Sequence, residues 1–222
     1  MGAELKAESF AKQRKSMVEL QLRTRGIYDS RVLAAMAHVP RHEFVSEEYW
    51  EQAYDDHPLP IGENQTVSQP YIVAVMLQAV SLSGPETVLE IGTGSGYEAA
   101  LLAELARKVY TVERHASLAH SAEAVLQRLG YNNVTVHVGD GSQGLPAYAP
   151  FDAIVVSAAA PRIPSSLFEQ LREGGRIAIP VGPAYSQEFQ LVQKEHGAMA
   201  ITRLDACRFV PLIGCQGYPE GW

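Results

Sequence analysis

The sequence predicts an α/β fold built on a doubly wound, mostly parallel β-sheet, with an antiparallel hairpin at its C-terminal end and a helical N-terminal region. From Glu86 onward, short apolar runs of strand length alternate with segments of helical periodicity. This alternation, with short turns, is typical of right-handed βαβ units that place helices on both faces of a parallel sheet. The tail differs, because two strand-like runs there are separated only by Glu195-His196-Gly197.

The alternating part gives specific expectations. The expected strands are residues 87–91, 109–112, 134–138, 151–157 and 176–180, with hairpin strands 189–194 and 201–211. The expected helices are residues 97–107, 115–129 and 167–171, the second ended by Gly130 and the third by Gly174-Gly175. A parallel sheet finished by an antiparallel hairpin is typical of the class I S-adenosylmethionine-dependent, Rossmann-like methyltransferases. Likeness of fold does not by itself fix the function.

The N-terminal third reads mainly as helices. Residues 5–22 form a polar segment with an apolar stripe, and Asp29 or Ser30 can cap a short helix that must end near Pro40. We treat residues 1–80 as a helical region that belongs to the same unit as residues 81–222, the α/β domain.

Between these helices and the α/β domain, residues 55–70 carry three prolines and few periodic apolar positions. We expect an ordered loop there. A helix over residues 69–80 should follow it, with Ser68 as its cap and Pro70 in its first turn.

Composition and charge exclude several classes of protein. The 222 residues include 18 Lys and Arg against 25 Asp and Glu, and the resulting formal charge of −7 argues against a dedicated nucleic-acid-binding protein. No apolar run approaches the roughly 18 residues needed to span a bilayer, and no signal-peptide core is present, so we expect a cytoplasmic protein without membrane contact. Cys207 and Cys215 are too few for a disulfide framework, and the histidines show no ligand spacing, so we expect reduced thiols and no metal.

A glycine turn follows the first strand of the α/β domain. Dinucleotide-binding turns have the spacing G-x-G-x-x-G, but Tyr97 stands where the third glycine would fall, and the match fails. The turn reads LEIGTGSG instead, with glycines at 92, 94 and 96 and Thr93 between them. An acidic residue directly before G-x-G-x-G resembles the S-adenosylmethionine turn. Glycines give clearance for the ligand, and Glu90 can hold its amino group directly or through water.

Two further acidic residues end neighbouring strands. Glu113 ends the second strand, where a carboxylate can accept both hydroxyls of a ribose, and Asp140 ends the third, where it can reach the adenine amino group. Gly141 next to it gives room. Ligands of open α/β sheets bind outside the carboxyl ends of the strands, where all three acids lie. Each acid alone is readily explained as a solvated or capping carboxylate; three beside one glycine turn predict a cofactor site.

Further segments carry a resemblance to one family. They are Tyr54 to Gly62, Gln65 to Pro70, Val88 to Tyr97 (VLEIGTGSGY), Gly139-Asp140-Gly141, Phe151 to Pro161 (FDAIVVSAAAP), Gly174-Gly175-Arg176 and Ile179 to Gly182. On these segments, from about residue 17 to residue 212, the chain resembles the protein-L-isoaspartate O-methyltransferases. The glycine turn alone is moderately specific, whereas PLPIG at 58–62 followed by QTVSQP at 65–70 is highly specific. Asn64 and Ser157 depart from the commoner Gly and Thr, and residues 214–222 have no family meaning that we can assign.

The resemblance implies transfer of the methyl group of S-adenosylmethionine to the α-carboxylate of isoaspartyl residues and, more weakly, of D-aspartyl residues in damaged proteins. S-Adenosylhomocysteine is the other product. The ester then forms a succinimide, and hydrolysis returns some normal aspartate, which is a repair reaction. The family motif marks Ser68 as an active-site residue, and we assign it, with the Thr66 hydroxyl, to aiming the substrate carboxylate.

The chemistry fits these groups. The carboxylate nucleophile has a pKa near 4 and is ionised at pH 7, so an in-line displacement needs alignment and a dry site rather than a strong base. His57 can be read as a base, but a lone histidine beside prolines is more often merely exposed. An N-cap role is the alternative interpretation of Ser68.

Substrate binding is expected along the proline-rich segment. Pro58, Leu59, Pro60 and Ile61 are read as the wall and water-excluding lid over the substrate backbone, with a plain packed connector as the alternative. Val67 and, by resemblance, Val210-Pro211-Leu212 are expected at the same cleft. Because a repair enzyme must accept many flanking sequences, we expect an extended, strand-like peptide rather than deep side-chain pockets. We expect a monomer that binds no nucleic acid.

Three rival functions stay open on the sequence alone. A methyltransferase of the same fold can act on a small molecule or RNA, although the net charge counts weakly against RNA. A member that has lost turnover would be a cofactor-binding module, against which the intact Ser68 and Thr66 argue. An NAD dehydrogenase is disfavoured by Tyr97.

Overall fold

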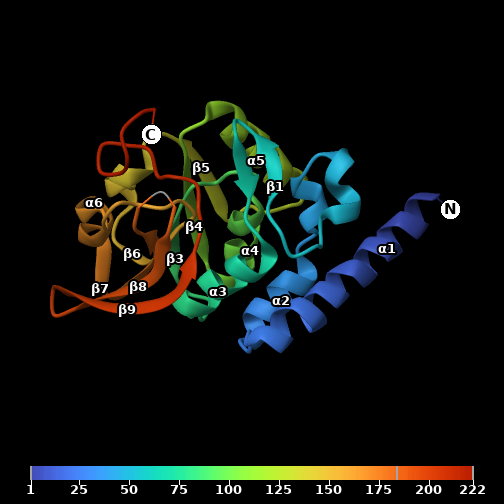
Figure 1. Ribbon diagram of the computed structural model, residues 1–222, viewed down its shortest axis with the longest axis horizontal. Helices are drawn as coiled ribbons and strands as arrows, with labels where there is room; N and C mark the ends of the chain where they lie inside the picture. The colour runs from blue at the N-terminus through green and yellow to red at the C-terminus, as the bar shows by residue number, and fades with distance from the viewer. Residues whose placement is uncertain (1, 184, 222) are drawn as a thin grey trace.

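The computed structural model describes residues 2–183 and 185–221, and its side chains from residue 6 onward (Figure 1). Seven strands of the described chain form the main sheet, in the order β5-β4-β3-β6-β7-β8-β9. Their bounds are β3 Thr87–Ile91, β4 Lys108–Glu113, β5 Val134–Val138, β6 Phe151–Val156, β7 Leu171–Val181, β8 Gln187–Glu195 and β9 Ala198–Cys207. The first five strands in this order are parallel, and β8 and β9 pair antiparallel. The predicted doubly wound sheet with an antiparallel C-terminal hairpin is confirmed.

Helices cover both faces of this sheet. Their bounds are α1 Gly2–Ser16, α2 Ser30–His38, α3 Pro70–Val80, α4 Tyr97–Leu105, α5 Ala116–Arg128 and α6 Ser165–Glu169. On one face, Val88 and Val155 of the central strands pack in one core with α2, α3 and α4. On the other face, Ile154 and Ile177 pack with Leu167 of α6. Successive strand residues point to opposite faces, so central strands buried on both sides are apolar nearly throughout.

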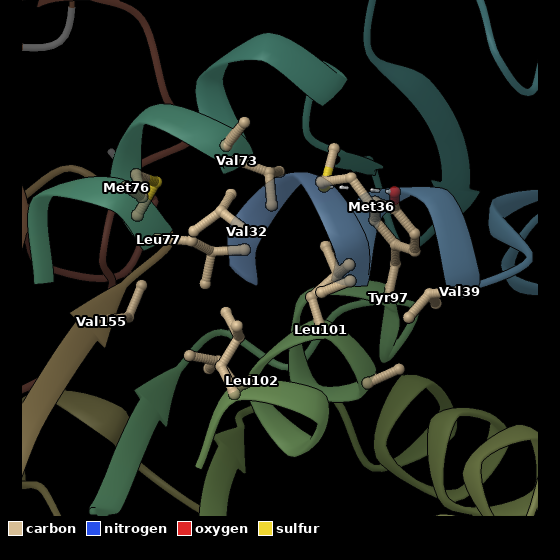
Figure 2. Close-up of a cluster of buried hydrophobic side chains, with 14 of the residues drawn as sticks. Val32, Met36, Val39, Val73, Met76, Leu77, Tyr97, Leu101, Leu102 and Val155 are labelled. Carbon is tan, nitrogen blue, oxygen red and sulfur yellow. Dashed lines mark hydrogen bonds between the residues drawn. The ribbon is translucent and has the colours of Figure 1, made fainter. Parts of the chain in front are cut away.

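The N-terminal helices share a hydrophobic core with the sheet (Figure 2). Figure 2 shows side chains of α2, α3 and α4 meeting above Val155 of β6. Tyr97 is buried among them and its hydroxyl contacts the sulfur of Met36 at 3.7 Å. Asp29 caps α2 as predicted, since its carboxylate accepts from the amides of Arg31 and Val32. Residues 1–80 and 81–222 remain our proposed division of one packed unit.

Two parts of the N-terminal third differ from expectation. Residues 55–70 are not only a loop, because β1 Leu59–Gly62 and β2 Gln65–Val67 pair antiparallel as a small separate sheet. The prolines in this segment obscure the strand pattern in the sequence. Pro60 is nevertheless tolerated in β1, because β1 pairs only with β2 and therefore lies at the edge of its sheet. The expected helix over residues 5–22 continues beyond α1 as a π-helical turn, Met17–Leu22.

The predicted cap of α3 is wrong. Gln69 is the N-cap residue and makes no side-chain capping bond, and Ser68 lies one residue before it. Pro70 is the first helical residue, so the helix begins one position later than a Ser68 cap requires. The serine side chain is thereby left available for another role. Similarly, β7 begins at Leu171, so the stretch around Gly174-Gly175 lies within a strand rather than ending a helix.

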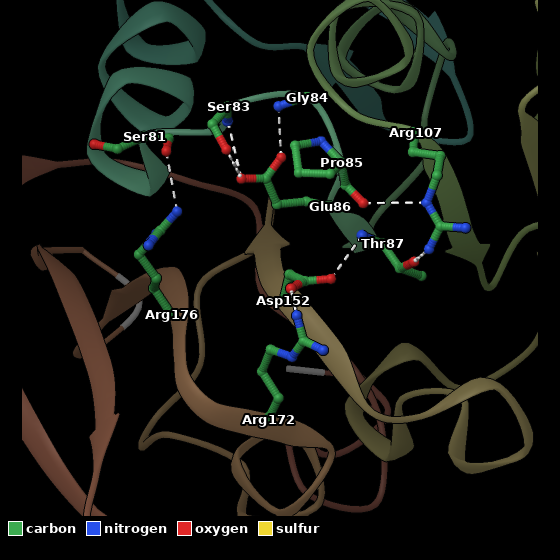
Figure 3. Close-up of polar contacts among 10 residues, drawn as sticks. All are labelled: Ser81, Ser83, Gly84, Pro85, Glu86, Thr87, Arg107, Asp152, Arg172 and Arg176. Carbon is green, nitrogen blue, oxygen red and sulfur yellow. Dashed lines mark hydrogen bonds and ion pairs between the residues drawn. The ribbon is translucent and has the colours of Figure 1, made fainter.

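The end of α3 far from Ser68 is tied to the sheet (Figure 3). Arg176 of β7 donates to the carbonyls of Val80 and Ser81, the latter at 3.0 Å. In the loop that follows, Glu86 accepts from the amides of Ser83 and Gly84 at 2.9 and 2.7 Å. These bonds fix the loop between α3 and β3, and with it the position of α3 over the sheet.

Candidate functional site

A cavity of about 880 Å³, part of it open to solvent, lies at the carboxyl ends of β3, β4 and β6. This is the point where the strand order reverses, because β4 lies on one side of β3 and β6 on the other. Ligands of open α/β sheets bind at such points. The predicted residues that line the cavity are Thr66, Val67, Ser68, Gly92, Thr93, Gly94, Glu113, Gly141, Val210 and Leu212. Most of the predicted site thus converges from five separate segments of the chain.

The glycine turn forms one wall of the cavity. Gly92, Gly94 and Gly96 all have positive φ, of 93°, 52° and 88°, which glycine adopts without strain. The amide of Gly92 bonds the Val112 carbonyl at 2.9 Å, so the turn is fixed to β4. Gly96 does not reach the cavity: a Cβ there would lie 3.2 Å from that of Ala122 on α5. Its role is the close packing of the turn against α5.

Glu113 lines the cavity at the end of β4, as predicted. Its carboxylate also holds the wall together, since it accepts from the amides of Gly94 and His115, both at 2.9 Å. Thr93 lies beside it, and its hydroxyl is 2.6 Å from that of Thr111.

Glu90 does not line the cavity. It is fully buried under the turn, where it accepts a 2.5 Å bond from the Thr111 hydroxyl. Burial raises the pKa of Glu90 well above its ordinary value, and the nearby carboxylates of Glu98 and Glu113 add to the effect. Of the two roles that the sequence left open for Glu90, a direct or a water-mediated contact with the cofactor, this geometry does not support the direct one.

Asp140 is likewise outside this cavity, although Gly141 lines it. The Asp140 carboxylate accepts from the amides of Ser142 and Cys215, both at 2.9 Å, and so holds the C-terminal loop. Burial acts to raise its pKa, but hydrogen bonds from Ser142, Cys215 and Gln143 outweigh it and lower the pKa to about 2. Its contact with the adenine amino group therefore stays a prediction that the observed bonds do not favour.

Ser68 and Thr66 stand where two cavities meet. Both line the first cavity and also a second, adjoining one of about 1150 Å³, again partly open to solvent. Neither hydroxyl makes a hydrogen bond within the described residues. Ser157, Val210 and Pro211 line both cavities as well. The junction thus presents free hydroxyl groups beside apolar side chains.

The residues of the proline-rich segment, 58–61, lie in different parts of the structure. Pro58 lines the second cavity, whereas Leu59 is buried and packs in the core. Pro60 and Ile61 line a different hollow, which residues of the glycine turn and of α5 also line. His57 is half-exposed, its ring bonds the adjoining Pro58 carbonyl, and it lines neither cavity, which agrees with the interpretation of an exposed histidine.

Val210 and Leu212 reach the site through an extended segment beside β6. The amide of Ala159 bonds the Val210 carbonyl at 2.8 Å, and the amide of Leu212 bonds the Ala159 carbonyl at 2.7 Å. The expected last strand instead ends at Cys207, and Pro211 makes only an isolated bridge to Ala159.

Sequence reasoning assigned no role at the site to Glu98, Ser157 or Asp56. Glu98, in the first turn of α4, is buried yet lines the first cavity, and Ser157 donates a short hydrogen bond to it. Asp56 accepts from the Gln69 amide group and the Tyr71 backbone amide, at 2.7 and 3.1 Å, and so fixes the start of α3. Asp56 belongs to the family-like segment and could have been singled out there; no sequence signal marked Glu98.

The described part of the chain shows neither a membrane-spanning helix nor a metal-binding cluster. No helix within residues 2–183 and 185–221 is long and apolar enough to cross a bilayer. Those same residues contain no cluster of three or more His, Cys, Asp or Glu side chains placed to hold a metal ion.

Comparisons with known proteins agree with this geometry. A family model described as "Protein-L-isoaspartate(D-aspartate) O-methyltransferase (PCMT)" matches residues 12–217. A protein-L-isoaspartate O-methyltransferase of Koribacter versatilis is 55% identical over 218 residues, which cover 98% of each chain. The likeness therefore includes both cavities and the segments between them.

Solved structures show the same likeness in three dimensions. One protein-L-isoaspartate O-methyltransferase superposes with a TM-score of 0.84 at 31% identity, covering 92% of this chain and 67% of its own. A second, from Plasmodium falciparum, is described as a putative enzyme of this kind in complex with S-adenosyl-L-homocysteine. It gives a TM-score of 0.79 at 27% identity, covering 90% of this chain and 98% of its own.

Proposed function

We propose that this protein, which belongs to the protein-L-isoaspartate(D-aspartate) O-methyltransferase family, binds its methyl donor in the first cavity and its peptide in the second. The protein is an enzyme that transfers a methyl group from S-adenosylmethionine to the α-carboxylate of L-isoaspartyl and, more weakly, D-aspartyl residues. This esterification begins the repair of damaged proteins. The observation that carries the assignment of the two cavities is that Ser68 and Thr66 line both of them.

The residues of the first cavity fit S-adenosylmethionine. Gly92 and Gly94 leave a wall without side chains, and Gly141 has no room for a Cβ, which would lie 2.5 Å from Ile91 Cγ2. We assign Gly92, Thr93, Gly94, Glu113 and Gly141 to the cofactor, with Glu113 at the ribose hydroxyls. When bound, the cofactor supplies an electrophilic methyl group on a positively charged sulfur.

The chain's own contribution to the reaction is alignment. The substrate carboxylate is ionised at neutral pH, so no residue has to remove a proton from it. The free Ser68 and Thr66 hydroxyls can donate to that carboxylate and hold it at the junction of the cavities. Val210 and Leu212 exclude water there, which favours a reaction in which opposite charges are neutralised. Such positioning can contribute up to about 7–11 kcal/mol.

The second cavity supports binding of the peptide as an extended chain. Pro58, Val210 and Pro211 give this cavity apolar walls. Among the described residues that line it, Arg208 is the charged one. Recognition through the peptide backbone suits an enzyme that must accept many flanking sequences. We also propose that the enzyme acts as a monomer in the cytoplasm without nucleic acid. The two free cysteines support a cytoplasmic location, and the net charge of −7 argues against nucleic acid as a partner.

The central test is Ser68→Ala. Loss of a hydrogen bond to a charged group costs about 1.5–3 kcal/mol, so kcat should fall about 10- to 100-fold. Affinity for S-adenosylhomocysteine should change less than twofold, because the glycine turn and Glu113 are untouched. Ser121→Ala on the exposed face of α5 is the matched control and should retain wild-type turnover. Wild-type kcat in Ser68→Ala would contradict the assignment.

The substrate is tested with an isoaspartyl peptide and its aspartyl twin, each incubated with enzyme and S-adenosylmethionine labelled in the methyl group. Base-labile label should appear only on the isoaspartyl peptide. Equal labelling of both peptides would show that the site does not distinguish an α-carboxylate from an ordinary side-chain carboxylate.

A further inference from the structure

Glu90 on β3 and Glu98 on α4 are among the buried carboxyl groups beside the cofactor cavity. Glu90 accepts from Thr111, and Glu98 accepts from Ser157 through its Oε2 atom. In each of them the Oε1 atom is buried and has no hydrogen-bond partner within the described residues. A buried carboxylate oxygen without a partner is costly, so each of these atoms needs either a proton or a ligand.

The two groups differ in what they face. Glu90 lies beneath the glycine turn and does not line the cavity, so a proton is the partner open to it. Burial raises the pKa of Glu90, which favours its protonated form. Glu98 lines the cavity, where a ligand can reach it. Burial raises the pKa of Glu98 to about 7 against the opposing Ser157 hydrogen bond. Glu98 therefore changes charge close to neutral pH.

The groups around Glu98 leave it without a cation of its own. Glu90 on β3, Glu113 on β4 and Ser157 directly after β6 are acidic or neutral, and Tyr97 next to it on α4 is a phenol. Two basic residues share the cavity wall, and both face other carboxylates. Arg114 pairs with Glu220 at 2.7 Å, and the His115 ring lies 3.8 Å from Glu63.

We propose that Glu98 is the carboxylate that binds the α-ammonium group of S-adenosylmethionine, in the role for which the sequence pattern favoured Glu90. The inference deepens the proposed placement of the cofactor in the first cavity. Glu98 lies next to Ser157, which lines both cavities, so it stands near the end of the cofactor site that adjoins the peptide. The amino-acid part of the cofactor carries the ammonium group and adjoins the sulfur. If the methyl group is to meet the peptide carboxylate, this amino-acid part must lie at the end of the first cavity that adjoins the second. A charge-assisted hydrogen bond there satisfies the free oxygen.

The sign of the pH dependence follows from this contact. Only the ionised form of Glu98 attracts the ammonium group, so cofactor binding lowers the pKa of Glu98 and releases a proton. Affinity should fall as the pH drops below about 7. In more alkaline solution the α-amino group of the ligand itself loses its charge, which gives a second decline that does not depend on Glu98. At pH 6.5, on the acid side of that pKa, the ligand is charged, so binding should be accompanied by proton release.

The test is calorimetric titration at pH 6.5 in two buffers of different ionisation enthalpy. The ligands are S-adenosylhomocysteine, which cannot react, and 5′-methylthioadenosine, which lacks the amino-acid part. Glu98→Gln should weaken S-adenosylhomocysteine at least tenfold, leave methylthioadenosine within twofold, and abolish the proton release. Unchanged proton release in Glu98→Gln, or equal loss of both ligands, would overturn the proposal.

Glu90→Gln is the matched variant, because it replaces the other buried carboxyl group by the same amide. It should retain the proton release and bind S-adenosylhomocysteine within threefold of wild type; loss of the release in this variant would place the titrating group on Glu90 and overturn the assignment. No peptide is present in these titrations. A failure of the Ser68 assignment would leave their outcome unchanged, so the two failures can be told apart.

Discussion

The two walls of the active site are built in different ways. The cofactor wall continues directly from β3, β4 and β6, which lie inside a seven-stranded sheet with apolar side chains buried on both faces. The peptide wall includes a hairpin of two short strands outside that sheet, which packs on the core through Leu59 and Val67 and is also held by polar contacts. Asp56 fixes it to Gln69 and Tyr71, and Ser117 of α5 donates to Glu63 in its turn at 2.6 Å.

This difference determines whether cofactor binding and peptide methylation can be perturbed separately. Packing in a sheet core is close to that of a crystal, so a change in the cofactor wall alters stability together with ligand affinity. Polar ties on a small hairpin can be removed singly, and their loss should affect peptide methylation more than cofactor binding.

The largest effect is expected for Gly141→Ala in the cofactor wall. The added Cβ would lie 2.5 Å from Ile91 Cγ2, so β3 or the loop after β5 must shift. Overpacking of this kind costs about 1–3 kcal/mol. Urea unfolding should show that loss, and affinity for S-adenosylhomocysteine should fall by about tenfold or more. Gly139→Ala is the control, since nothing lies within 4 Å of its Cβ and its stability should stay within about 0.5 kcal/mol of wild type.

An intermediate effect is expected for Asp56→Ala in the peptide wall. The variant loses the hydrogen bonds to Gln69 and Tyr71 that fix the start of α3, and loss of a comparable cap costs about 1 kcal/mol. Because Ser68 lies directly before these partners, kcat/KM for the isoaspartyl peptide should fall by about tenfold. Asp55→Ala removes an exposed neighbouring carboxylate and should have little effect. If S-adenosylhomocysteine affinity in Asp56→Ala fell as much as kcat/KM, the two walls would not be independent.

The smallest effect is expected for Asn64→Gly in the hairpin turn. Asn64 has a φ of 56°, in the left-handed region that Asn tolerates and Gly adopts freely. Relief of strain and the greater freedom of the unfolded chain should nearly cancel, so thermal unfolding should change by less than about 0.5 kcal/mol. Asn64→Val, with a β-branched side chain at this φ, should destabilise the hairpin by about 1–2 kcal/mol. Equal stability of these two variants would show that the turn relaxes to another conformation.

Much of the fold could be predicted because its signals are local. The strands at residues 87–91 and 134–138 have the predicted bounds, since a short apolar run between turn residues has few other stable arrangements in an α/β pattern. The hairpin of β8 and β9 was visible from alternation on both sides of a turn, and His196 and Gly197 both have positive φ there. The β1–β2 hairpin was missed because three- and four-residue strands containing Pro60 give too short a pattern.

The predicted site divides in the same manner. Positions at strand ends and in the glycine turn could be predicted to converge, because all parallel strands end at the same edge. The sequence could not predict which carboxylate reaches the ligand. Glu90 and Thr111 are paired across β3 and β4, so Glu90 turns to a hydroxyl under the turn, while the helical position of Glu98 brings it to the cavity.

The sequence by itself determined the family, the parallel sheet, the glycine turn and the segment that carries Ser68, because each is recorded in short runs of neighbouring residues. Only the tertiary structure decided that Glu98 rather than Glu90 lines the cavity, that Asp140 holds the C-terminal loop, and that Asp56 fixes the start of α3. These assignments depend on burial and on partners more than ten residues away in sequence. A pattern of neighbouring residues carries no information about such contacts.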